Sequence, residues 1–208
     1  MSFNWQALVK KTILKPKDAA REIIQLRQLL SREMLWSMVI VVAALMAMSY
    51  WVQWELFPPA APASPQEAAA QQIMERIAAR PFLAATLFAC GIVVLINVLH
   101  WTGRLFGGTG GLHDMAAVFL WLQFFLVAAG ALTLVLALVL MPLAALIAMI
   151  ANVLGLWILI AFVDEVHGFN SPFKSLGVLI AGVVLMVLGF MLLAFLILTT
   201  GAGVAAHV

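Results

Sequence analysis

The stretch "MAAVFLWLQFFLVAAGALTLVLALVLMPLAALIAMIANVLGLWILIAFV", residues 115–163, contains no charged side chain. A helix needs roughly 20 apolar residues to cross the hydrocarbon of a bilayer, so this stretch is too long for one crossing and long enough for two. Pro142 is the natural break, because proline inside a helix removes a backbone hydrogen bond. We therefore expect two spans, at about 115–140 and 143–163, joined by a tight turn.

The rest of the chain has the same character. Its 208 residues are 65% hydrophobic and only 10% charged, with a mean hydropathy of +1.13. A soluble domain carries about 25% charged residues, so this composition indicates a polytopic membrane protein. Further apolar runs at about 35–54, 81–101 and 175–198 complete the expected fold class, an all-α membrane protein with five transmembrane helices.

The first 34 residues form a basic segment ahead of the first span. After Pro16, apolar residues recur at helical spacing and most charged residues fall on the other side, which predicts an amphipathic interfacial helix. Its basic face would meet anionic head groups, or its apolar face would pack on the protein's own spans; the sequence leaves both open. We divide the chain into this segment (1–34), a five-span membrane domain (35–199) and a short tail (200–208). The proline-rich connector between the first two spans predicts a short helix over 66–80.

The distribution of basic residues predicts the orientation. Nine Lys and Arg residues fall before the first span and in the second and fourth connections, against two, Arg76 and Arg80, in the first connection. The basic side is normally the cytoplasm. We expect a bacterial inner-membrane protein with a cytoplasmic N-terminus and, because five spans are odd in number, a periplasmic C-terminus.

The segment "GRLFGGTGGLHDM", residues 103–115, is the one glycine-rich loop, and such loops can hold phosphates. A Walker loop would need lysine where Thr109 stands, and the dinucleotide pattern fails at His113. No strand is expected before either pattern. We interpret the loop as a structural joint in which Gly107, Gly108 and Gly110 permit unusual backbone angles, with Asp114 as the N-cap of the third span.

Three amide side chains lie within the expected spans and away from the span ends: Asn97, Gln123 and Asn152. They could line a solute path, but such amides are more often hydrogen-bonding glue between helices. Proton- or ion-coupled transporters usually need a charged residue deep in a span, and none is expected here. The pattern favours a packing role.

A second polar group is expected at the cytoplasmic interface. Asn97, His100 and Arg104 are spaced to share one helix face. The other members at the same depth are His113, Asp114, Asp164, Glu165 and His167. A histidine–carboxylate metal site is one interpretation, but no H-x-x-x-H pair is present, and we favour an ion pair of Arg104 with Asp164 or Glu165.

Three segments together resemble a known family: "ALVKKTILKPKDAAREI" (7–23), "GRLFGGTGGLHDMAAVFLWLQFF" (103–125) and "FVDEVHGFNSPFKSLGVLI" (162–180). They are similar to the bacterial branch of the Yip domain family, integral membrane proteins named for eukaryotic members that interact with Ypt/Rab GTPases. The most specific pieces are Pro16 with Ala19, Ala20 and Arg21, then Gly107, Gly108 and Gly110, then Glu165, His167 and Gly168. The resemblance implies a helical membrane protein without known catalysis. It does not carry over a GTPase partner, because a bacterium has no comparable Rab system.

The expected function is that of a non-catalytic accessory or scaffold subunit, or a membrane-organising factor, acting through helix–helix and partner association. The alternative is a small-solute or ion channel or transporter, and an enzyme ranks third. Expected partners are anionic lipids at the cytoplasmic face and another membrane protein or a second copy; we expect no nucleic acid, nucleotide, cofactor, metal or catalytic residue. The structural or interaction candidates are Arg104, Gly107, Gly108, Gly110, Asp114, Asp164, Glu165, His167, Asn97, His100, Gln123 and Asn152.

Overall fold

The computed structural model describes residues 4–205, which are helical apart from turns and connections and contain no strand. The helices are α1 (Trp5–Leu14), α2 (Pro16–Arg27), α3 (Arg32–Leu56), α4 (Pro65–Ala78), α5 (Pro81–Leu105), α6 (Leu112–Ala137), α7 (Met141–His167) and α8 (Pro172–Ala205).

Within the described residues, α3, α5, α6, α7 and α8 are each long and apolar enough to cross a membrane, which confirms the predicted fold class. The turn between α6 and α7 occupies residues 138–140, and Pro142 lies in the first turn of α7, where a missing N–H costs no helical hydrogen bond. The connector also forms a helix: the hydroxyl of Ser64 accepts from the Glu67 N–H and caps the start of α4.

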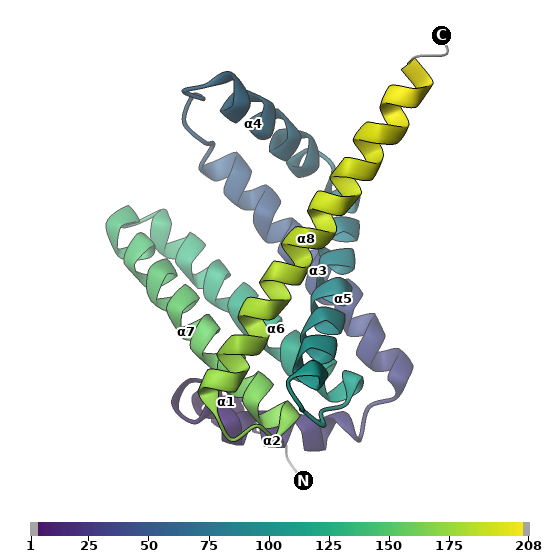
Figure 1. Ribbon diagram of the computed structural model, residues 1–208. Helices are drawn as coiled ribbons and strands as arrows, with labels where there is room; N and C mark the ends of the chain where they lie inside the picture. The colour runs from purple at the N-terminus through teal and green to yellow at the C-terminus, as the bar shows by residue number, and fades with distance from the viewer. Residues whose placement is uncertain (1–3, 206–208) are drawn as a thin grey trace.

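The two ends of the bundle carry different short helices (Figure 1). Helices α1 and α2 lie across the end that also holds the α5–α6 and α7–α8 loops; we call this the α2 end. Helix α4, the α6–α7 turn and the C-terminus lie toward the opposite end, which we call the far end. The N- and C-termini therefore lie at opposite ends, as five crossings require.

Helix α2 packs with its apolar face against α6 and α7. Ala19, Ala20 and Ile23 on that face are buried. Of the two interpretations left open for this segment, the structure therefore shows packing on the protein's own spans. Helix α1, which the sequence analysis did not predict, is capped by Asn4 and folds back on α2.

The packed core lies toward the α2 end. Met115 to Leu120 are six consecutive buried residues of α6, so this helix is enclosed on every side there by neighbouring helices. Helices α2, α3, α5 and α7 all contact α6. The core thus sits beside the loops that carry the predicted polar residues.

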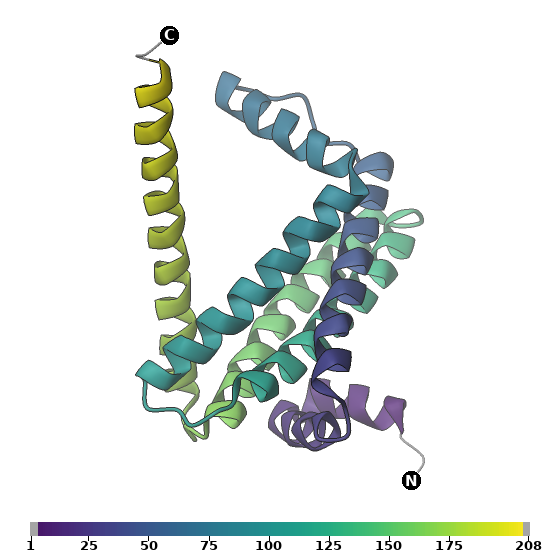
Figure 2. The same ribbon diagram turned by 90° about the vertical axis from the view of Figure 1, so that its right-hand side faces the viewer.

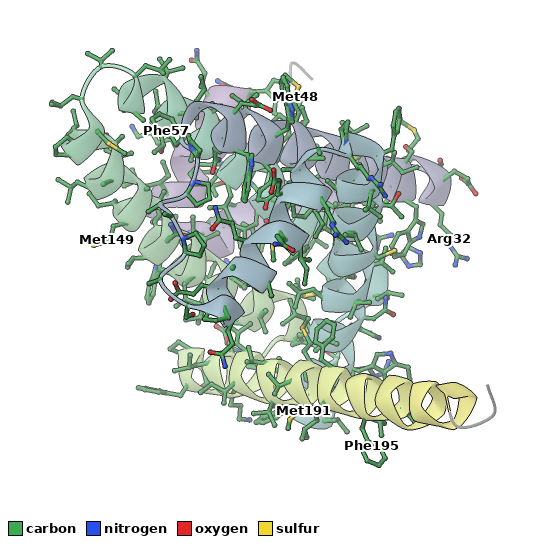
Figure 3. The ribbon with its side chains drawn as sticks, turned by 90° about the horizontal axis from the view of Figure 1, so that it is seen from above. Arg32, Met48, Phe57, Met149, Met191 and Phe195 are labelled. Atoms are coloured by element: carbon green, nitrogen blue, oxygen red, sulfur yellow. The ribbon has the colours of Figure 1, made fainter. Side chains whose placement is uncertain are left out.

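Helix α8 separates from the bundle toward the far end. It contacts α5 and α7, but its buried described side chains are confined to its first three turns and end at Val178, Leu179 and Gly182. Figure 2 shows α8 diverging from α5 with height, and Figure 3 shows it from above along one side of the other helices, with Met191 and Phe195 labelled. The far end is accordingly more open than the α2 end.

Candidate functional site: an ion-paired cluster at the α2 end

Helix α7 ends with two acidic residues, Asp164 and Glu165, in its last turn. The C-terminus of a helix carries a partial negative charge, so carboxylates there need compensation. Two cations one turn apart on α2 supply it: Lys17 forms an ion pair with Asp164, and Arg21 forms one with Glu165. With a third pair, Arg27–Asp114, these six residues form what we call the α2 cluster.

Asp164 is the buried centre of the α2 cluster, with a side chain only 1% exposed. One carboxylate oxygen pairs with the ammonium group of Lys17. The other accepts the Ser171 N–H at 2.8 Å and a longer hydrogen bond from the Ser175 hydroxyl at 3.4 Å. This carboxylate therefore joins α2, the α7–α8 loop and the start of α8.

Arg21 contacts Glu165 through two parallel hydrogen bonds. Its Nε donates to Oε1 at 2.7 Å and its Nη2 donates to Oε2 at 3.0 Å. The hydrogen bonds and charge of Glu165 raise the pKa of Arg21 above its ordinary value, and Asp18 one turn earlier adds to this. A guanidinium matches a carboxylate in this two-bond geometry, which orients α2 as well as attaching it.

The prediction that Asp114 caps the start of α6 is wrong. The N-cap of α6 is Gly111, and Asp114 lies inside the first turn, so it is not the capping residue. Its Oδ1 instead accepts from Nε and Nη2 of Arg27 at 2.9 and 2.6 Å. The carboxylate still lies near the positive end of the α6 dipole, and it also fixes the end of α2 to the start of α6.

The predicted ion pair of Arg104 with Asp164 or Glu165 is wrong. Arg104 is exposed in the last turn of α5 and makes no ion pair with any residue in the described part of the chain. Both carboxylates are already paired with α2 cations. Lys17, Arg21 and Arg27 were not predicted as the partners of these carboxylates, although Arg21 is among the residues that carry the family resemblance. The available signal was the helical spacing of cations on α2.

His167 lies in a cradle of glycines. Its side chain is buried, and a Cβ at Gly103 would meet the ring closer than van der Waals contact allows. A Cβ at Gly108 would lie 2.6 Å from His167 Cβ, and one at Gly110 would lie 2.6 Å from the Val166 carbonyl oxygen. Glycine at these three positions lets the end of α5 and the α5–α6 loop pack closely on the end of α7.

Only Gly107 among the loop glycines has a positive φ, of 85°. The prediction that Gly108 and Gly110 serve unusual backbone angles is therefore wrong: they provide space for the end of α7. The Thr109 N–H donates to the His167 carbonyl at 3.2 Å, which ties the loop directly to α7.

The histidines do not assemble a recognisable metal site within the described residues. The His100 and His167 rings lie 6.3 Å apart between centroids, whereas His113 packs edge-on to Trp36 at 6.5 Å. No group of three His, Cys, Asp or Glu residues in the described part could hold a metal ion.

Two of the three amides predicted to join helices bond within their own helix instead. The side-chain amide of Asn97 donates to the Val93 carbonyl at 2.8 Å, and that of Asn152 donates to the Ala148 carbonyl at 2.8 Å. Gln123 is half-buried on α6. Asn152 also lines a far-end cavity of about 460 Å³ between α3, α6 and α7, with five alanines among its thirteen lining residues. It lies away from the α2 cluster.

The ion pairs of the α2 cluster hold α2 in a fixed position against α6 and α7, and we call this arrangement the clamp. Three cations on one helix bind carboxylates at the start of α6 and the end of α7, so a shift of α2 would have to break ion pairs at both places. Trp121 of α6 adds an attachment for α1, because its indole N–H donates to the Thr12 hydroxyl at 2.9 Å.

Comparisons with known proteins agree with this architecture. Neither the curated proteins nor the solved structures contain a significant match to the chain. The family model described as "Yip1 domain" matches residues 10–200, which include α2, all the loops of the α2 cluster and the five candidate spans. The chain therefore belongs to the Yip1 domain family of integral membrane proteins.

Proposed function

We propose that this chain is a non-catalytic accessory or scaffold protein of the bacterial inner membrane that presents the α2 end to a partner. The observation that carries the proposal is the clamp itself: ion pairs fix α2 to the start of α6 and to the end of α7. A surface that is already held in one geometry loses little conformational entropy when it binds a partner. The partner is another membrane protein or a second copy of the chain.

The orientation forms part of the proposal. With the α2 end in the cytoplasm, the basic side chains follow the positive-inside rule and the C-terminus is periplasmic. The cations at this end that form no ion pair with a described residue are all exposed: Lys10, Lys15, Arg32, Arg104 and Lys174. These, rather than the clamped cations of α2, are the residues we expect to attract anionic lipid head groups.

A channel or transporter is supported less well. The far-end cavity would have to continue through the bundle to conduct a solute, and toward the α2 end it meets the enclosed segment of α6 from Met115 to Leu120. The family membership also favours a membrane protein without catalysis.

The test is purification of the full chain in mild detergent, with identification and stoichiometry of whatever copurifies. We expect a defined partner, or a defined homo-oligomer, that is retained by the wild type and by Arg32→Ala and is reduced in Arg21→Ala. Arg32 is the matched control because it is exposed and unpaired. A monomer without a stoichiometric partner that conducts small solutes in liposomes would contradict the proposal.

Reporter fusions at the C-terminus test the orientation separately. Activity of a periplasm-specific reporter is expected. A fusion active only in the cytoplasm would reverse the orientation, and with it the assignment of the α2 end to the cytoplasm.

A further inference from the structure

A cavity of about 420 Å³ opens at the α2 end, where α1 passes into α2 beside the outer side of α7. It is separate from the far-end cavity and from the glycine cradle of His167. The lining residues that matter to its chemistry are Lys15, Lys17, Asp18, Trp157, Ile160 and Asp164.

The wall that α7 provides changes from polar to apolar along the helix. Trp157, Ile160 and Asp164 lie on one face, at spacings of three and four residues. Seven residues of α helix between Trp157 and Asp164 correspond to about 10 Å along the axis. One head-group layer of a bilayer is about 5–8 Å thick, so this wall is long enough to reach from head groups into hydrocarbon.

Trp157 is half exposed on a membrane-spanning helix, although it lies more than two turns from the end of α7. An indole prefers the boundary between head groups and acyl chains, where it has an apolar body and one N–H donor. The cavity supplies a role, because the residue lies where polar lining gives way to apolar lining.

One of the two lysines that line the cavity forms no ion pair. Lys17 is paired with Asp164, whose other oxygen is occupied by α7–α8 donors. Asp18 also lines the cavity, and its carboxylate shares Arg21 with Glu165. Lys15 is exposed, lines the cavity and forms no ion pair with a described residue. The cavity therefore presents one unpaired ammonium group, with the carboxylate of Asp18 in the same lining, above an apolar wall.

We propose that this cavity binds one glycerophospholipid of the surrounding leaflet, with its phosphodiester at Lys15 and the start of its acyl chains against Trp157 and Ile160. Basic pockets between membrane helices bind lipid head groups in this way. A free phosphate would use the lysine but leave the apolar wall uncovered. The inference rests on the proposed attraction of this end for lipid head groups, and it replaces a diffuse surface attraction with a single site.

Native mass spectrometry of the full chain in detergent tests the site. The chain is titrated with short-chain phosphatidylglycerol, short-chain phosphatidylethanolamine, a dialkylglycerol that lacks phosphate, and inorganic phosphate. We expect one saturable phospholipid per chain, with either head group, and much weaker binding of the dialkylglycerol and of phosphate. Lys15→Gln should weaken phospholipid binding about five-fold, because it removes one cation next to the lipid phosphate.

Lys11→Gln is the matched control, since Lys11 is a lysine of α1 that is paired with Glu22 and does not line the cavity. Ala161→Leu is the second variant, because Ala161 lines the cavity and a larger side chain there reduces its volume. We expect phospholipid binding to be unchanged in Lys11→Gln and weakened in Ala161→Leu.

Three results would overturn the site: equal phospholipid binding by wild type and Lys15→Gln, equal binding of the phosphate-free dialkylglycerol, or binding of inorganic phosphate as tight as that of phospholipid. None of these measurements uses a protein partner. Failure of the scaffold proposal in the copurification test is therefore distinguishable from failure of the lipid site.

Discussion

The two ends of this bundle are held together differently. At the α2 end, residues far apart in sequence are joined by directional bonds: Arg21 with Glu165, Arg27 with Asp114, and Trp121 with Thr12. At the far end, the described side-chain hydrogen bonds are local; Thr133 and Asn152 each bond a carbonyl one turn earlier in their own helix. The far end is therefore joined across helices by apolar contact alone, among the residues that the structure describes.

This difference indicates which end of the bundle tolerates fewer substitutions. Packing of apolar side chains tolerates substitutions that conserve volume, whereas a buried carboxylate or a glycine beneath a ring tolerates almost none. The α2 end therefore has one geometry and can serve as a recognition surface. The far end, where α8 leaves the bundle (Figure 2), should tolerate more substitutions.

The largest effect is expected at the glycine cradle. Gly103→Ala should lower the free energy of unfolding by about 3 kcal/mol, because the new Cβ overlaps the buried His167 ring and overpacking of this kind costs about 1–3 kcal/mol. Unfolding of the chain by titration with a denaturing detergent measures the effect.

Gly91→Ala is the control for the cradle, because Gly91 lies on the same helix, α5, and a Cβ there meets nothing within 4 Å. This variant should be neutral or slightly stabilising. The double variant Gly103→Ala/His167→Ala should be less destabilised than the sum of its parts. If Gly103→Ala proved as harmless as Gly91→Ala, the cradle would not be the constraint that we describe.

The next effect is expected at the buried carboxylate. Asp164→Ala should cost about 2 kcal/mol of unfolding free energy, since the Ser171 N–H loses its acceptor and Lys17 loses its counter-ion. Asp18→Ala is the comparison, because Asp18 is exposed and its contact with Arg21 lies on the surface; a change below about 0.5 kcal/mol is expected there. Similar losses in the two variants would mean that burial of Asp164 does not matter.

Much of the fold could be predicted from the sequence because span length and the position of Pro142 are local properties. The apolar stretch 115–163 divides into two helices as expected, although the turn lies at residues 138–140, just before the expected break at Pro142. Helix α1 was missed because Lys10 and Lys11 interrupt its apolar pattern, and its stability depends on contacts with α2. Local patterns carry no information about such contacts.

The α2 cluster could be predicted only in part. The carboxylates Asp114, Asp164 and Glu165 were recognised as part of a polar group at one end, but Arg104 was assigned as the partner of Asp164 or Glu165, and Asp114 was assigned as a helix cap. The actual partners lie on α2, and Arg21 is separated from Glu165 by 144 residues. To identify which cation pairs with each carboxylate, one must know how α2 docks on the spans. Burial of Ala19 and Ala20 against the spans sets this docking.

A smaller effect is expected from a substitution that keeps the charge of Arg27 but changes its hydrogen-bond geometry. Arg27→Lys should lower the unfolding free energy by about 0.5–1 kcal/mol, because lysine cannot reproduce the two guanidinium hydrogen bonds to Asp114. Arg32→Lys should change nothing measurable, because Arg32 is exposed and unpaired. Equal values for the two variants would show that Arg27 acts only as a charge.

The smallest effect is expected at the far end, from a substitution that would be damaging elsewhere. Ala148 lines the far-end cavity of about 460 Å³, so the larger side chain of Ala148→Leu has room, and the unfolding free energy should change by less than about 0.5 kcal/mol. The same change at Ala116, which is completely buried in the enclosed part of α6, should cost about 1–3 kcal/mol. Both variants add the same volume and apolar area to a membrane helix, so the difference between them measures packing density alone. Equal destabilisation at the two positions would mean that the far end is as tightly packed as the α2 end, and the contrast between the two ends would then rest only on their polar bonds.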